Sequence, residues 1–155
     1  MAYENYEAGD LVFLNAEIAG PGGYFTQLVR TFSLGQPSPE VREGFAACLA
    51  AQEAGIEQLQ PGAQAGQVYD AIVTSLARSG FAMGLHPGHS QGLDIFEKPV
   101  IGPGDTTQLQ PGMVIILHPH LLLPTSGGIW LGDTFLVTEA GACRLNQVPR
   151  ELAIV

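Results

Sequence analysis

Residues 11–34 read LVFLNAEIAGPGGYFTQLVRTFSL, in which two apolar runs flank the turn sequence GPGG. Runs rich in Val, Phe, Ile and Thr on both sides of a glycine- and proline-rich turn are typical of a β-hairpin. The run LVFL at residues 11–14 has no polar residue between its apolar ones, which is typical of a strand buried on both faces. We therefore expect an antiparallel hairpin over residues 11–34.

Two helices are predicted after the hairpin. Ser38 suits an N-cap and Pro39 the first helical position, and apolar residues then keep helical spacing over residues 41–59. A second apolar stripe begins at Val68 and ends before Gly80, a residue type suited to the left-handed stop of a helix.

The remaining chain predicts a glycine- and proline-rich loop over residues 84–104, followed by three strands with the sequences MVIILH, GGIWLGDTFLVT and CRLNQ. The predicted order is ββ-αα-loop-βββ. This order indicates an α+β fold with antiparallel strands, formed as one domain over residues 1–155.

The composition excludes several classes of partner. The chain has 155 residues, a net charge of -9 and only one lysine, Lys98, so nucleic acid and anionic membrane are not expected as partners. Neither a basic, apolar leader nor an apolar run of membrane-spanning length is found, which predicts a cytoplasmic protein. Cys48 and Cys143 lie in separate apolar segments and are expected to be buried free thiols.

All four histidines lie at the ends of two segments punctuated by glycine and proline. His86 and His89 occur in LHPGHSQG, and His118 and His120 end GMVIILHPH. Imidazole serves both in proton transfer and as a ligand for zinc, nickel or copper. The pattern leaves both uses open, although no cysteine or acidic residue is positioned with the four histidines.

Six phrases in order carry a family resemblance: GDLVFLN, GYFTQLVRTF, the helical stretch beginning PSPEVREGF, HPGHSQGLDIFEKP, LQPGMVIILHP and GGIWLGDTFLVTEAG. Together they resemble the C-terminal two thirds of the pita-bread domain shared by aminopeptidase P, prolidase, methionine aminopeptidase and creatinase. The resemblance implies a partial pita-bread fold and covers nearly the whole chain.

In the metallopeptidases of that family, five side chains hold two metal ions. The resemblance places these ligands at Asn15, Gln27, His89, His118 and Gly132. Only His89 keeps the residue type of the family, and hard divalent ions require anionic oxygen ligands. The resemblance therefore implies neither a dimetal aminopeptidase nor a metal cofactor.

Among these relatives the chain is most similar to creatinase, which also has Asn after the first strand run, a GYYT-like start to the second strand and GHS in the loop. Creatinase hydrolyses a C–N bond without metal and holds its cationic substrate with carboxylates. The two carboxylates fall on Val29 and His118 here, so creatine itself is not expected. The resemblance implies a metal-independent, creatinase-like hydrolase or lyase acting on a small polar molecule.

The resemblance also assigns roles to individual residues. We expect His89 and His118 to be catalytic and to lie in one pocket. The substrate-binding residues are expected to be Tyr24, Gln27, Asn15, His86 and His120. A charged residue on an apolar strand needs a partner, so we expect Arg30 to form a structural salt bridge. Asp133 is expected to hold either that arginine or a backbone turn.

The alternative function is a non-catalytic pita-bread subunit that binds a ligand or stabilises a catalytic partner. In either case we expect the chain to work with another polypeptide, because the family domain begins well before the GDLV phrase and the first strand would otherwise keep unpaired edges. That partner is expected to be a second chain carrying the N-terminal half of the fold, or a second copy in a homo-oligomer.

Overall fold

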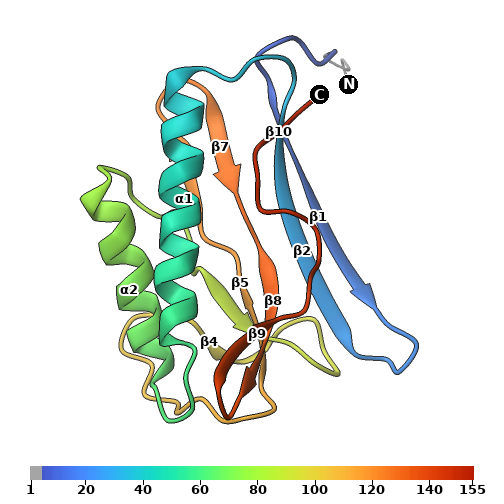
Figure 1. The fold of residues 1–155 in the computed structure, drawn as a ribbon, viewed down its shortest axis with the longest axis vertical. Helices are drawn as coiled ribbons and strands as arrows, with labels where there is room; N and C mark the ends of the chain where they lie inside the picture. Colours follow the sequence, from blue (N-terminus) through green and yellow to red (C-terminus); the bar gives the residue numbers. More distant parts are fainter. Residues whose placement is uncertain (1–4) are drawn as a thin grey trace.

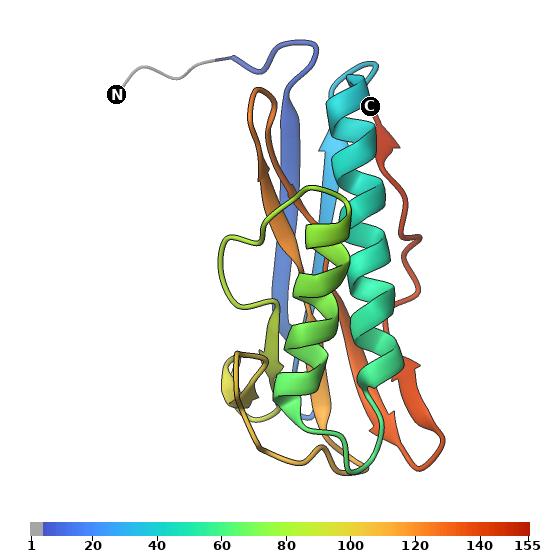
Figure 2. The same ribbon diagram turned by 90° about the vertical axis from the view of Figure 1, so that its left-hand side faces the viewer.

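The structure is a computed structural model that describes residues 5–155. Two helices lie side by side over one face of the strands, and Figure 2 shows them in front of the strands. The predicted α+β class is therefore confirmed. The elements are β1 (Leu11–Ala19), β2 (Phe25–Ser33), α1 (Pro39–Gln58), α2 (Ala65–Arg78), β3 (Gly88–Ser90), β4 (Glu97–Val100), β5 (Val114–Leu117), β6 (His120–Leu123), β7 (Gly127–Trp130), β8 (Asp133–Thr138), β9 (Gly141–Arg144) and β10 (Ala153–Ile154).

The strands form three sheets. One has the order β1-β2-β10, the second β4-β3-β5-β8-β9, and the third is the β6-β7 pair. All pairs are antiparallel except β2 with β10. A bridge between Val29 and Gly132 connects β2 to the β7–β8 junction, so the hairpin lies beside the second sheet.

Both helices begin and end as the sequence predicts. The side chain of Ser38 accepts a hydrogen bond from the backbone N–H of Val41, which caps α1. Gly80 follows α2 with a φ of 79°, a conformation that favours glycine. The buried faces of both helices pack on the core around β5, in which Ile115 and Leu117 are fully buried.

The strand predictions need four corrections. The loop over residues 84–104 contains the short strands β3 and β4, and β6 and β10 were not predicted. The run GGIWLGDTFLVT is not one strand, because the chain passes from the β6–β7 pair into β8 at Leu131 and Gly132.

The expected burial of β1 on both faces is wrong for this structure. β1 is an edge strand, and the side chains of Phe13, Leu14 and Ile18 are more than half exposed. By contrast, β5 is buried, since Ile115, Ile116 and Leu117 are all fully buried. One of the two thiols is also misassigned, because Cys143 is exposed whereas Cys48 is buried, which raises the pKa of Cys48 to about 12.

The expected salt bridge of Arg30 is present, and of the two alternatives for Asp133 the structure shows the pairing with Arg30, at 2.7 Å and with both side chains buried. The other four guanidinium N–H groups donate to backbone carbonyl oxygens at distances of 2.7–2.9 Å. These carbonyls belong to Val29, Gly132, Val148 and Pro149. Arg30 therefore joins the hairpin, the β7–β8 junction and the C-terminal segment at one point.

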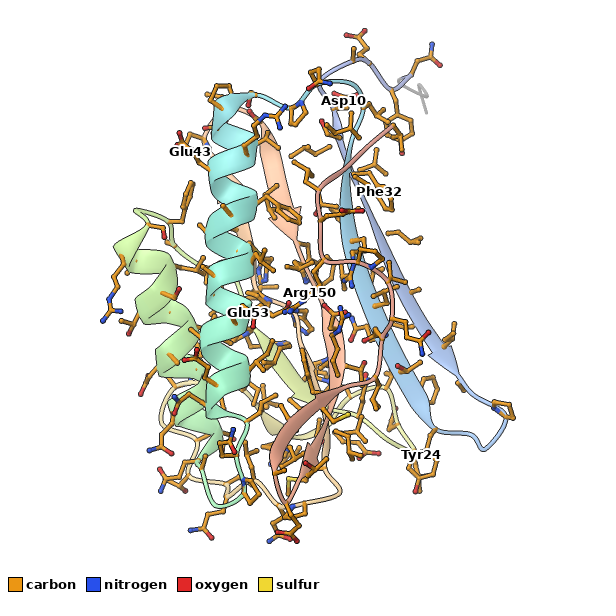
Figure 3. The ribbon with its side chains drawn as sticks, viewed as in Figure 1. Asp10, Tyr24, Phe32, Glu43, Glu53 and Arg150 are labelled. Carbon is orange, nitrogen blue, oxygen red and sulfur yellow. The ribbon has the colours of Figure 1, made fainter. Side chains whose placement is uncertain are left out.

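The C-terminal segment is also held to α1. Arg150 pairs with Glu53 and donates to the side-chain oxygen of the buried Gln52. Figure 3 shows Arg150 and Glu53 close together between the segment and the helix. No helix within residues 5–155 is both long enough and apolar enough to cross a membrane.

Gly88 provides a test of how closely β3 approaches β5. A Cβ added at Gly88 would lie 2.2 Å from the carbonyl oxygen of Ile116, a backbone atom that cannot turn aside. We expect Gly88→Ala to lower the free energy of unfolding by about 3 kcal/mol, because the two strands must separate to fit the methyl group. Urea unfolding monitored by circular dichroism measures this change.

The matched control is Gly22→Ala in the hairpin turn. A Cβ there meets no atom within 4 Å, and Gly22 does not have a positive φ. This variant should unfold within about 0.5 kcal/mol of the parent. Equal losses for the two variants would contradict the packing described for β3.

Candidate functional site

Three of the four histidines, which come from two segments of the chain, approach one another. The ring centroids of His89 and His118 lie 5.3 Å apart, and those of His86 and His118 lie 5.5 Å apart. His89 lies on β3, which pairs with β5, and His118 directly follows β5. Sheet pairing therefore brings together residues separated by the long loop and places the predicted pair in one pocket.

The pocket is a cleft of about 300 Å³ between the hairpin and the second sheet. The lining residues are Glu17, Gln27, Leu85, His86, His89, Phe96, His118, His120 and Trp130. Five of the seven predicted site residues line this cleft: Gln27 and the four histidines.

The other two predicted site residues lie outside the lining. Asn15 is an exposed residue of β1, and its side-chain oxygen accepts a hydrogen bond from the amide of Gln27 at 3.0 Å. Tyr24 is 59% exposed at the tip of the β1–β2 hairpin and borders a different, open cleft (Figure 3). The structure therefore does not bring Tyr24 to the histidines.

Sequence reasoning missed Glu17, Leu85, Phe96 and Trp130 as lining residues. Glu17 is two positions from Asn15 on β1, so their side chains lie on the same face of the strand. This two-residue period of a strand was the signal in the sequence that could have identified Glu17. Trp130 lies in the apolar run of residues 129–131 and Phe96 follows Ile95 in the loop, and nothing in the sequence distinguishes either of them from a packed core residue.

The imidazoles of His89, His118 and His120 favour their neutral form. Burial lowers the pKa of His118 to about 3, and the neighbouring imidazoles act in the same direction. Burial also lowers the pKa of His89 and of His120 below the ordinary value. At neutral pH these rings therefore present lone pairs rather than positive charge.

Individual hydrogen bonds fix two of the rings. Nδ1 of His89 lies 2.9 Å from the carbonyl oxygen of Ser90, which can only accept, so the neutral ring carries its proton on Nδ1 and leaves Nε2 as an acceptor. Nε2 of His120 accepts from the backbone N–H of Leu85 at 2.8 Å.

The comparison with known proteins identifies the family. Residues 2–139 match metallopeptidase family M24, and the chain therefore belongs to this family of hydrolytic enzymes. The Xaa-Pro dipeptidase of Pyrococcus furiosus is 37% identical over 94% of this chain and 42% of its own length. The chain thus spans about two fifths of the length of this relative.

Solved structures give the same result. The crystal structure of dipeptidase PepE from Mycobacterium ulcerans superposes with a TM-score of 0.92 at 34% identity, over 96% of this chain and 41% of the other. Methionine aminopeptidase from Rickettsia prowazekii, at 20% identity and a TM-score of 0.78, shares the fold over 89% of this chain and 64% of its own. The expected partial pita-bread fold is confirmed.

These findings overturn the functional prediction. The relatives are named dipeptidases and Xaa-Pro dipeptidases, so a creatinase-like hydrolase or lyase acting on a small polar molecule is wrong. The prediction of metal-independent chemistry is also overturned, because the family is a metallopeptidase family. The broader expectation of an enzyme is supported to the extent that the chain belongs to a family of peptidases.

The side chains present do not fit the metal pair that the family name implies. Asn15 and Gln27 are neutral amides that bond to one another, and Gly132 offers no ligand. A Cβ added at Gly132 would lie 2.8 Å from Cγ2 of Val29 and 3.0 Å from Cβ of His118, so a longer side chain has no room. Within residues 5–155 no group of three or more His, Cys, Asp or Glu side chains is arranged to hold a metal ion.

The depressed pKa of His118 predicts an acid-sensitive fold. In the unfolded chain His118 takes up a proton near its ordinary pKa of 6.5, whereas in the folded chain it does so only near 3. The free energy of unfolding is therefore unaffected by His118 above about pH 6.5 and falls by about 1.4 kcal/mol for each pH unit between 6.5 and about 3.

Urea midpoints between pH 7 and pH 5 measure this loss, with His118→Gln as the control. The variant lacks the titrating ring, so its stability should fall less steeply with acid. If NMR shows His118 titrating near pH 6.5 in the folded protein, its described burial is wrong.

Proposed function

We propose that this chain forms the site-bearing part of a peptidase that acts on dipeptides or other short peptides. The observation that carries the proposal is the convergence of His89 and His118 from paired strands in one small cleft. A cleft of about 300 Å³ with mainly apolar walls has the size of a ligand of one or two amino acids. The names of the relatives, Xaa-Pro dipeptidase and dipeptidase, support the same substrate class.

Within this proposal His89 accepts a proton. Its ring is neutral, its Nδ1 donates to the carbonyl of Ser90, and its free Nε2 is the atom able to take a proton from an attacking water. His118 is less suited to this task, because its pKa of about 3 makes it a weak base. His118 instead accepts a hydrogen bond and orients the substrate beside His89.

Hydrolysis of a dipeptide panel that includes Xaa-Pro substrates tests this function. The protein is assayed with any co-purifying chain, after chelation and again after addition of divalent metal. We expect turnover by the parent and a loss of about 10²–10⁴-fold for His89→Ala, the range of a general base. Asp70→Asn, an exposed change on α2, serves as control and should retain full activity.

The absence of peptide hydrolysis under all of these conditions would overturn the proposal. A His89→Ala variant that folds normally and retains full activity would overturn the role given to His89.

We further propose that β1 pairs with a polypeptide segment corresponding to the part of its relatives that this chain does not cover. β1 is an edge strand with exposed Phe13, Leu14 and Ile18 side chains, and exposed apolar edges of this kind favour pairing. Glu17 on the same strand lines the cleft, so a segment paired with β1 would lie next to the site. The occupant is expected on a second chain, and the alternative is a second copy of this chain.

Analytical ultracentrifugation of the chain purified without a partner tests this proposal. We expect self-association at micromolar concentration, and a defined complex once the second chain is present. The double change Phe13→Ser and Ile18→Ser should reduce both the self-association and the formation of the complex, because it removes exposed apolar area from β1. A cooperatively unfolding monomer that forms no complex would contradict the proposal.

A further inference from the structure

The histidine cleft is lined by hydrogen-bonding side chains and aromatic rings, and the described residues place no permanent cation in it. None of the described residues that line it is a lysine or an arginine, and one, Glu17, carries a carboxylate. The whole chain has a net charge of -9, so the field around the cleft attracts cations.

The amide of Gln27 has a fixed orientation. Its Nε2 donates to Oδ1 of Asn15 and to Oε1 of Glu17, each at 3.0 Å. Turning the amide over would place its oxygen against two acceptors, so the network determines which end is the oxygen. Oε1 of Gln27 is buried and has no protein partner, and the residue as a whole is only 2% exposed. A buried acceptor of this kind requires a donor from a ligand or water.

Imidazole nitrogens can extend this set of acceptors. Nδ1 of His118 and Nδ1 of His86 are also buried without a protein partner, and each accepts a hydrogen bond when its ring carries the proton on Nε2. Nδ1 of His89 donates its proton to the carbonyl oxygen of Ser90, so Nε2 of the same ring is left as an acceptor. The complementary ligand therefore donates several hydrogen bonds from one small group.

Aromatic rings surround the same space. The ring of Phe96 lies 4.3 Å from that of His89, and the ring of Trp130 lies 5.8 Å from that of His118, measured between centroids. The faces of Trp and Phe attract cations and also accommodate the carbon atoms next to the charge. A cation with attached carbon suits this lining better than a bare ion, since no described group is arranged to hold a metal ion.

We propose that this cleft binds a protonated primary amine. The three N–H groups of the ammonium donate to Oε1 of Gln27 and to the imidazole nitrogens, while the carboxylate of Glu17 balances the charge. The attached carbon chain lies against Phe96 and Trp130. This inference concerns binding alone and does not depend on peptide hydrolysis.

The test uses n-butylammonium and its neutral counterpart 1-butanol as probes of the full protein. Binding is followed by the NMR signals of the histidine rings and of Trp130. We expect n-butylammonium to bind at least about tenfold more tightly than 1-butanol and to shift the His89, His118 and Trp130 signals.

Two variants in the cleft, Glu17→Gln and Gln27→Met, locate the interaction, and Glu139→Gln is the control. Glu17→Gln should weaken n-butylammonium binding about tenfold and leave 1-butanol unchanged, because only the charge is removed. Glu139→Gln makes the same change at an exposed position outside the cleft and should have no effect. Gln27→Met keeps the side-chain length but removes the acceptor, and it should also weaken the amine.

Equal binding of amine and alcohol by the parent protein would overturn the proposal, and this comparison stands even if a variant fails to fold. If Glu17→Gln and Glu139→Gln weaken n-butylammonium binding equally, the proposed location in the cleft is wrong, because the loss then reflects the net charge of the protein. The proposal would also be wrong if Zn²⁺ binds tightly and shifts the same histidine signals while n-butylammonium shifts none of them. The ligand of the cleft would then be a metal ion.

Discussion

The guanidinium of Arg30 is the contact on which the arrangement of the site depends. It satisfies all five of its N–H groups on Asp133 and on four backbone carbonyls from three parts of the chain. A buried ion pair of this kind contributes little net stability, but the loss of one partner leaves an unpaired charge in the interior. Its main effect is therefore geometric, because it sets the distance between the hairpin that carries Gln27 and the junction that faces His118.

Strong local signals accounted for the parts of the fold that could be predicted. The Ser38-Pro39 start of α1, the Gly80 stop of α2 and the GPGG turn each determine backbone conformation within a few residues. The division of GGIWLGDTFLVT between two sheets could not be predicted, because it depends on the long-range pairing of Val29 with Gly132. The exposure of β1 depends on whether another segment covers it, which no local pattern records.

The site was predicted unevenly for the same reason. His89 and His118 were found because the resemblance located them on elements that pair in the fold. The phrases GYFT and GHS suggested creatinase, but in this structure they form the start of β2 and the short buried strand β3. Backbone requirements of this kind identify a fold, whereas the chemistry depends on the side chains that the fold brings together, such as Glu17 and Phe96.

The crowding around Gly132 has a consequence for the order in which substitutions can accumulate. Val29 and His118 occupy the space that any side chain at residue 132 would need. A smaller residue at position 29 must therefore appear before residue 132 can enlarge, and a mutation at 132 that comes first damages the packing. The packing of its neighbours thus favours glycine, and an acidic residue cannot be accommodated at this position in one step.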